Sequence, residues 1–202
     1  NAAAALMNEN SGLSDVASGD KKFYANPDVV GNFNSDPEVI WYSYQQNSQT
    51  DWEEINYSPS QYGEGLTNPS QNLVNAFPME DGTPTLSSKF NSNDSYSGRD
   101  PRLDMFVLYN GAQYQRAGST VTVNTTDGSQ DALGSTDVNA TRTGYYLKKF
   151  MNVEDVNLDP SVNSGGLQYF TYARYTDVLL MFAEAANEVG GPDASISGYS
   201  AR

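Results

Sequence analysis

Aromatic and amide side chains are concentrated in one stretch of the chain, between residues 41 and 62. An aromatic ring of Trp or Tyr offers an apolar face with a polar edge, and an amide offers both hydrogen-bond donors and acceptors. A sugar ring has an apolar C–H face surrounded by hydroxyl groups, so a stacking ring with neighbouring amides is the minimum that a glycan site needs. The residues predicted to contact such a ligand are Trp41, Trp52, Tyr57, Tyr62, Gln46 and Asn47.

The alternative for these rings is packing in the hydrophobic core. Trp41 lies in the run Val39 to Tyr44, whose β-branched and aromatic residues are typical of a strand, and core packing is the favoured interpretation for it. Trp52, Tyr57 and Tyr62 lie in a polar stretch without apolar periodicity, so the pattern is as consistent with a ligand-facing position as with burial.

Catalysis has few candidate residues in this chain. The sequence contains no histidine and no cysteine, which removes Ser–His and Cys–His catalytic pairs and the usual zinc ligands. Four carboxylates lie near the aromatic residues, and glycoside hydrolysis requires a pair of carboxylates; they are Asp51, Glu53, Glu54 and Glu64. In a chain with a net charge of −14, a solvated acidic surface is the favoured interpretation, and a carboxylate-dependent glycoside hydrolase is the alternative.

The charge and the loop composition bear on ligands as well. A strongly acidic chain repels phosphate groups, so we expect no nucleic-acid partner. Residues 127–137 offer oxygen ligands that suit calcium, but their spacing is not that of an EF-hand loop. We therefore expect a flexible loop and no cofactor, with calcium binding as the alternative. No apolar run is long enough to cross a membrane.

Short strands and turns are predicted through the middle of the chain. Asn110-Gly111 is a strong hairpin signal, because a type I′ turn needs positive φ at both central residues. A short helix is predicted after Asn68, which would cap it, with Pro69 at the first helical position. The sequence Arg-Asp-Pro-Arg at 99–102 is expected to be structural, with an Arg–carboxylate pair that fixes a turn. The predicted strands are 39–44, 105–109, 120–125 and 145–150.

A helix over residues 173–189 is the clearest predicted element. Its apolar side chains recur at helical spacing, and Gly190-Gly191-Pro192 ends it. A helix with such a stripe needs a partner to pack against, and this chain supplies few other helices. The stripe consists of Tyr175, Val178, Leu179, Phe182, Ala186 and Val189.

Four segments, in order, resemble the C-terminal half of SusD/RagB proteins. The family's pattern around Leu-Val-x-x-Phe-x-Met-x-Asp-Gly is similar to residues 68–84, and its Arg-Asp-Pro-Arg-Leu stretch to residues 98–111. The segment TGYYLKKFM at 143–151 and the helix of 170–192, with Arg-Tyr-x-Asp-Val-Leu-Leu, complete the resemblance.

The resemblance implies a mostly α scaffold, a tetratricopeptide-like α-α superhelix, in which this chain contributes α structure, irregular loops and a few short antiparallel strands. Three parts are expected: residues 1–35 as a helix end and loop, 36–168 as a loop-rich ligand-binding subdomain, and 169–202 as a scaffold helix and linker. The resemblance also implies a lipid-anchored protein on the extracellular face of the cell outer membrane of Bacteroidetes-type bacteria. Such proteins hold oligosaccharides without cleaving them and pass them to a SusC-like TonB-dependent transporter.

The chain also departs from that family. It has about half the length of a typical member or less, and the N-terminal helix pairs, the anchoring cysteine and a last helix are not in its sequence. We therefore expect it to be a fragment of a longer protein. The family's ligand residues do not form a fixed motif, so none is transferred from the resemblance. Capture of a peptide or glycoprotein by the same uptake system is the remaining alternative.

Overall fold

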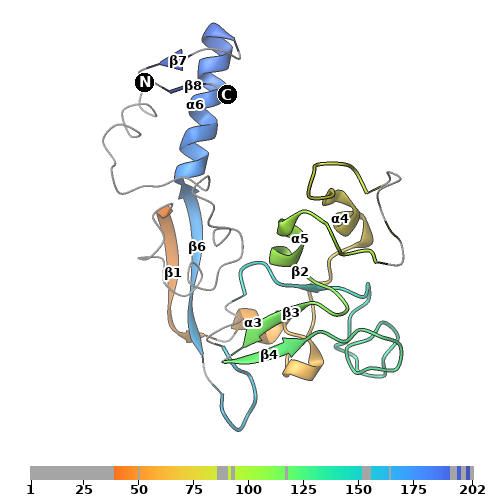
Figure 1. The fold of residues 1–202 in the computed structure, drawn as a ribbon. Coiled ribbons are helices and arrows are strands. Elements are labelled where there is room, and N and C mark those ends of the chain that lie inside the picture. The colour runs from red at the N-terminus through yellow and green to blue at the C-terminus, as the bar shows by residue number, and fades with distance from the viewer. Residues whose placement is uncertain are drawn as a thin grey trace.

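The computed structural model describes residues 39–49, 51–85, 91, 94–116, 118–151, 156–163, 165–191, 195–196 and 199–200 (Figure 1). The helix end and loop predicted in residues 1–35 lie outside these ranges. Among the described helices, none is long and apolar enough to span a membrane.

A two-stranded ribbon forms one side of the molecule. β1 (Val39–Gln49) pairs antiparallel with β6 (Gly166–Arg174), and α6 (Tyr175–Gly190) continues directly from β6 in the same column (Figure 1). The register shifts on both sides of Trp41 and again between Gln45 and Gln49. The strand predicted at 39–44 is confirmed and is longer than expected. β6 is not among the predicted strands, because the pairing that stabilises it comes from a strand more than a hundred residues earlier in the chain.

The predicted C-terminal helix is confirmed as α6. The Arg174 backbone N–H donates to the Asp177 carboxylate (2.8 Å), which satisfies one of the free donors at the helix start. At the other end Gly191 adopts a φ of 80°, and its N–H donates to the Asn187 carbonyl. Tyr175, Phe182 and Ala186 of the predicted stripe are buried. Val189, at the end of the predicted stripe, is 87% exposed and lies one turn beyond the last buried residue.

The described residues from Asp51 to the start of β6 form a lobe of short elements beside this column (Figure 1). Its helices are α3 (Asp51–Asn56), the 3-10 helix η4 (Pro59–Gln61), α4 (Gln71–Ala76) and α5 (Pro101–Phe106). Its strands are β2 (Val107–Leu108), β3 (Gln113–Arg116), β4 (Ser119–Thr122) and β5 (Tyr146–Leu147). Outside the lobe, β7 (Ser195–Ile196) pairs with β8 (Tyr199–Ser200) after the end of α6. β2 pairs with β5, and β3 with β4. The general expectation of helices, loops and short antiparallel strands is confirmed.

Helix capping explains why the strand predicted at 105–109 is mostly helical. The Asp100 side chain accepts the Arg102 backbone N–H, and Pro101 occupies the first helical turn, so α5 begins there. The helix extends through Met105 and Phe106, so only β2 remains of the strand predicted at 105–109.

The hairpin prediction at Asn110-Gly111 is wrong in its pairing. A turn does form, with Gly111 at φ 86° and the Ala112 N–H donating to the Tyr109 carbonyl (3.0 Å). The strand before that turn pairs with β5, however, and the local hairpin joins β3 to β4 around Gly118. The strands predicted at 120–125 and 145–150 are present as the shorter β4 and β5.

The cap of α4 also differs from the prediction. Ser70 is the N-cap, and its hydroxyl accepts the Leu73 N–H (3.2 Å). Asn68 instead joins two loops, since its side chain donates to the Gly65 carbonyl (2.8 Å) and accepts the Arg142 N–H (2.9 Å).

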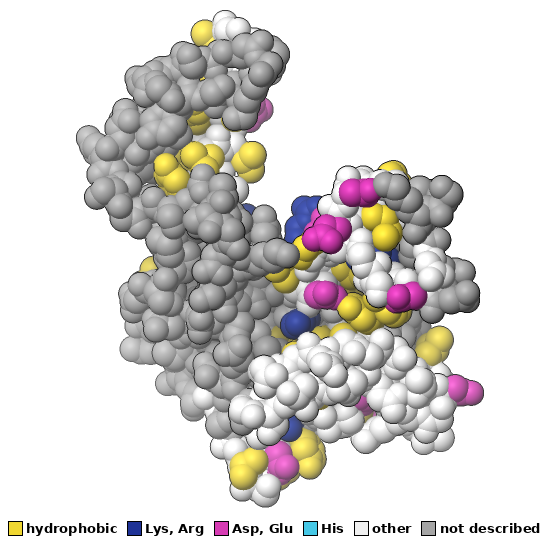
Figure 2. Space-filling view, in the orientation of Figure 1, with side chains coloured by type: hydrophobic (Ala, Val, Ile, Leu, Met, Phe, Trp, Pro, Cys, Tyr) yellow, Lys and Arg dark blue, Asp and Glu magenta, His cyan; other side chains and the backbone are white. Residues whose placement is uncertain are grey.

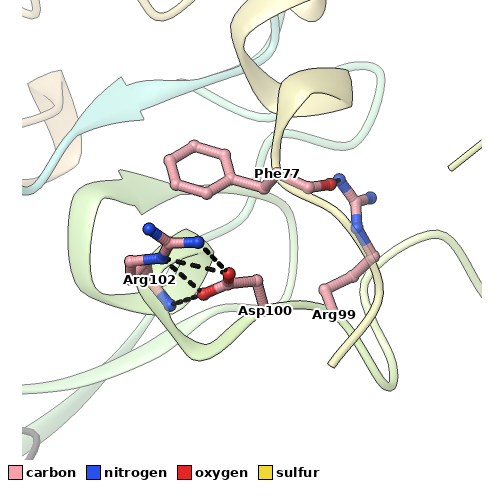
Figure 3. A network of polar contacts seen from close by, with 4 residues as sticks. All are labelled: Phe77, Arg99, Asp100 and Arg102. Carbon is pink, nitrogen blue, oxygen red and sulfur yellow. Dashed lines mark hydrogen bonds and ion pairs between the residues drawn. The ribbon is translucent and has the colours of Figure 1, made fainter. Parts of the chain in front are cut away.

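The Arg-Asp-Pro-Arg sequence is structural, as predicted (Figure 3). The Arg99 guanidinium donates to the carbonyls of Val74 (2.5 Å) and Phe77 (2.8 Å), at the end of α4, and to that of Ser95 (2.8 Å). Asp100 turns the other way and pairs with Arg102. The Arg99 side chain thus binds the end of α4, and the Asp100 side chain caps the start of α5.

Two hydrophobic clusters lie inside the lobe. The smaller one joins α4, α5, β2 and the residue before β5 through Val74, Leu103, Val107 and Tyr145. The larger one underlies the α3–η4 segment and the β3–β4 hairpin, and it contains Tyr57, Leu108, Tyr114, Val123, Tyr146, Met151, Val156 and Leu158.

Candidate functional site

Tyr57 belongs to the core and not to the surface. Its side chain is fully buried, and its hydroxyl donates to the Val156 carbonyl (3.2 Å). Gly63 packs so closely on it that an added Cβ would lie 2.2 Å from the Tyr57 carbonyl oxygen. Because the ring has no exposed face, the core-packing alternative describes Tyr57. Trp52 is half-buried and packs against the same cluster, so part of its side chain also belongs to the core.

Tyr62 is the predicted aromatic residue that this segment presents to solvent. Its side chain is 55% exposed, directly after η4. The Tyr62 N–H donates to the Pro59 carbonyl (2.9 Å), and its φ is 65°. A bulky residue in the left-handed region is uncommon, and such strain persists where the surrounding structure imposes it. The tight turn thereby holds the ring out from the lobe.

Asp159, a charged side chain that was not predicted, lies beside Tyr62. Hydrogen bonds from Ser161, from its hydroxyl (2.7 Å) and its N–H (2.8 Å), hold the pKa of Asp159 below its ordinary value. A hydrogen bond from Tyr62 and the positive charge of Arg116 act on the pKa of Asp159 in the same direction. An exposed ring with an ionised carboxylate beside it can stack on a sugar face and bind its hydroxyls. We call Tyr62, Asp159 and Ser161 the Tyr62 surface.

Sequence reasoning missed Asp159 because it comes from the loop of residues 156–163, far from Tyr62 in the chain. The sequence Asp159-Pro160-Ser161 signals a turn in which the Asp side chain bonds its own backbone. It does not reveal which surface that turn joins.

Trp41 is exposed, so the expectation that it fills the core is wrong. It is 65% exposed and contacts Tyr172, which is 61% exposed, with ring centroids 5.1 Å apart and a tilt of 47°. Trp41 lies eight residues before the end of β1, or roughly 25 Å along an extended strand. The ribbon therefore separates this pair from the α3–η4 segment. Gln46 and Asn47 lie in β1 between Trp41 and the α3–η4 segment, where the register of β1 shifts.

The predicted acidic surface is confirmed at Glu54 and Glu64, which are exposed, and is wrong at Glu53, which is 1% exposed in the core. The side chain of Asp51 lies outside the description.

The loop of residues 127–137 surrounds a polar cavity of about 450 Å³. It is anchored to η4, because the buried Asp131 carboxylate accepts the backbone N–H (2.8 Å) and the hydroxyl (2.6 Å) of Ser60. Gln130 donates to Asp137 (3.1 Å) across the loop. Among the residues that the structure describes, no group of three or more acidic, histidine or cysteine side chains is arranged to hold a metal ion.

Comparison with known proteins places these features in a family. The model of the SusD family matches residues 37–199. A crystal structure of a SusD-like carbohydrate-binding protein from Bacteroides fragilis is similar, with a TM-score of 0.66 and 22% identity over 95% of this chain and 36% of the other. A second SusD-like protein from the same organism has a TM-score of 0.62 and 23% identity over 83% of this chain and 36% of its own. The chain thus spans about a third of the length of these proteins. No curated protein matches the sequence.

Proposed function

The chain belongs to the SusD family, and on that premise we propose that it binds oligosaccharides without cleaving them. The observation that carries the proposal is the Tyr62 ring, which is 55% exposed in a turn with a φ of 65° and lies next to Asp159. A sugar stacked on this ring would bury apolar area on its C–H face, while the Asp159 carboxylate would bind hydroxyls at its edge.

The expected contribution of the ring is modest. One aromatic face stacked on one sugar contributes about 1 to 2 kcal/mol through buried apolar area and favourable ring geometry. Each 1.4 kcal/mol changes the dissociation constant about tenfold, so one such ring makes only a small contribution to affinity. A site of this kind suits capture and release better than tight retention.

We further infer the setting in which this binding operates. The chain would form part of a lipid-anchored protein on the outer face of the bacterial outer membrane. There it would deliver oligosaccharides to a SusC-like TonB-dependent transporter. Within the full-length protein, α6 would pack into a tetratricopeptide-like helical scaffold, and residues 36–168 would form the ligand-binding part above it.

The test is affinity-gel electrophoresis of the full-length protein against a panel of soluble polysaccharides, with chromatography of the incubated oligosaccharides. The proposal expects retarded migration in at least one gel and unchanged oligosaccharides in solution. Turnover that a single Asp or Glu substitution abolishes would identify a glycoside hydrolase instead. Binding of peptides with no glycan binding would identify a peptide-capturing protein.

A further inference from the structure

The loop of residues 127–137 is anchored at Asp131 by contacts in two directions. The buried Asp131 carboxylate accepts the backbone N–H (2.8 Å) and the hydroxyl (2.6 Å) of Ser60, in η4. The Asp131 carbonyl accepts the hydroxyl of Tyr146 (3.0 Å), whose side chain is fully buried in the larger cluster. The loop is thus joined both to the core and to the short helix that precedes Tyr62. A loop held in this way has little conformational entropy to lose when a ligand binds.

The cavity that this loop surrounds is polar throughout. Its volume of about 450 Å³ is within the range of small-ligand pockets, roughly 300 to 1,000 Å³, but such pockets are mostly apolar. Among the described residues that line it, none is aromatic, aliphatic or cationic. Its polar side chains are those of Asp127, Ser129, Gln130, Ser135, Thr136 and Asp137. Because carboxylate, amide and hydroxyl oxygens accept hydrogen bonds, the cavity suits a ligand rich in hydroxyl groups.

The charges in this part of the lobe are unfavourable to an anion. Asp127 and Asp137 line the cavity, and Asp159 lies beside the Tyr62 ring. Figure 2 shows mostly uncharged polar side chains and backbone over the lower part of the lobe, where Figure 1 places β4 and the loop that follows it. A carboxylate or sulfate group on a ligand would be repelled by these side chains and by the net charge of −14, whereas a sugar hydroxyl can donate to them.

We propose that the cavity of residues 127–137 is a second subsite next to the Tyr62 surface, and that it binds a neutral hexose residue of the glycan through the sugar hydroxyls. This inference rests on the proposed glycan binding and specifies the class of glycan. η4 connects the two subsites, because Ser60 binds the loop and Tyr62 follows two residues later, at most about 7 Å away between Cα atoms. The Tyr62 ring provides stacking on the sugar face, and the cavity provides hydrogen bonds that depend on where each hydroxyl lies.

The experiment is isothermal titration calorimetry of the full-length protein with maltohexaose, cellohexaose and mannohexaose, and with each oligomer after oxidation of its C6 hydroxyls to carboxylates. EDTA is present throughout, so that no cation bound by the two cavity carboxylates can mediate the contact. At least one neutral oligomer is expected to bind, and about tenfold more tightly than its oxidised form, since the carboxylate both repels and loses a hydroxyl donor.

Two variants place this preference in the cavity. Thr136→Trp puts a large ring among the lining residues and should weaken binding of the neutral oligomer about tenfold, the equivalent of one or two lost hydrogen bonds. Val138→Trp is the matched control, because Val138 is in the adjoining chain, is 88% exposed and does not line the cavity. It should bind like the wild type.

The outcomes separate this inference from the proposed function. If no glycan of any kind binds, the proposed function is overturned. If other glycans bind but none of the three neutral hexose oligomers does, or if an oxidised form binds as tightly as its neutral parent, the neutral-hexose inference is overturned and the proposed function stands. Wild-type affinity in Thr136→Trp would also overturn it. Should Thr136→Trp fail to fold by thermal unfolding, Asp127→Asn decides at constant size: it should narrow the preference for the neutral oligomer, and an unchanged preference overturns the inference.

Discussion

Replacing Arg99 by methionine should destabilise the folded protein strongly. The residue is 7% exposed, and its guanidinium donates to the carbonyls of Val74, Phe77 and Ser95 at 2.5 to 2.8 Å. Two of these carbonyls belong to the end of α4, whose last carbonyl groups have no partner within the helix. Methionine fills a similar volume but donates nothing, so the substitution leaves buried acceptors without a donor.

The magnitude follows from these contacts. A hydrogen bond from a charged donor contributes about 1.5 to 3 kcal/mol net, and a buried acceptor left unsatisfied costs about 1 to 3 kcal/mol. Burial lowers the pKa of Arg99, which shows that the folded state also bears a cost for desolvating the guanidinium. Removing that cost offsets part of the loss. We expect a net decrease of about 3 to 5 kcal/mol in the free energy of unfolding.

Urea unfolding followed by tryptophan fluorescence measures this change. Arg102→Met is the matched control in the same motif, because Arg102 pairs with Asp100 and its side chain is 49% exposed. Loss of such an exposed pair should cost less than about 1 kcal/mol. Equal midpoints for the two variants would refute the assignment of Arg99 as the residue that holds the end of α4.

Two other predictions concern stability. Gly63→Ala should lower the free energy of unfolding by about 1 to 3 kcal/mol in the same urea assay, because the new Cβ would lie within 2.4 Å of two Tyr57 atoms and the backbone must move; a wild-type midpoint would show that the turn has room to relax. Hydrogen bonds from Arg102 hold the pKa of Asp100 below its ordinary value. A carboxylate with a depressed folded-state pKa adds stability above its unfolded pKa of about 3.9 and loses it as the pH falls through the folded value. Asp100→Asn should therefore reduce stability at neutral pH and match the wild type at strongly acidic pH, and an unchanged gap across a pH series would contradict this.

Local signals predicted the elements that local interactions determine. α6 has a long apolar period, Gly190 and Gly191 at its end and a capping carboxylate at Asp177, so its pattern and its structure agree. At α5 two local signals compete, and the cap of Asp100 and Pro101 prevails over the strand-forming residues that follow. β6 depends on pairing with β1, which no local pattern of residues 166–174 reveals.

The same distinction between local and long-range interactions applies to the candidate site. The composition of residues 41–62 indicated a stacking surface, and Tyr62 is exposed as such a surface requires. Sequence could not separate Tyr62 from Tyr57, because burial there depends on Val156 and the rest of the larger cluster, which come from later segments. Asp159 reaches Tyr62 only through the fold.

The most direct test of the central claim is the affinity of Tyr62→Ala for the glycan that the full-length protein retains best. Leu66→Ala is the control, since Leu66 is 61% exposed in the same segment and Tyr62 is 55% exposed. Titration calorimetry should show about a five- to thirtyfold loss of affinity for Tyr62→Ala, no change for Leu66→Ala, and the wild-type thermal midpoint for both. Wild-type affinity in Tyr62→Ala would contradict the claim that the Tyr62 surface holds the sugar.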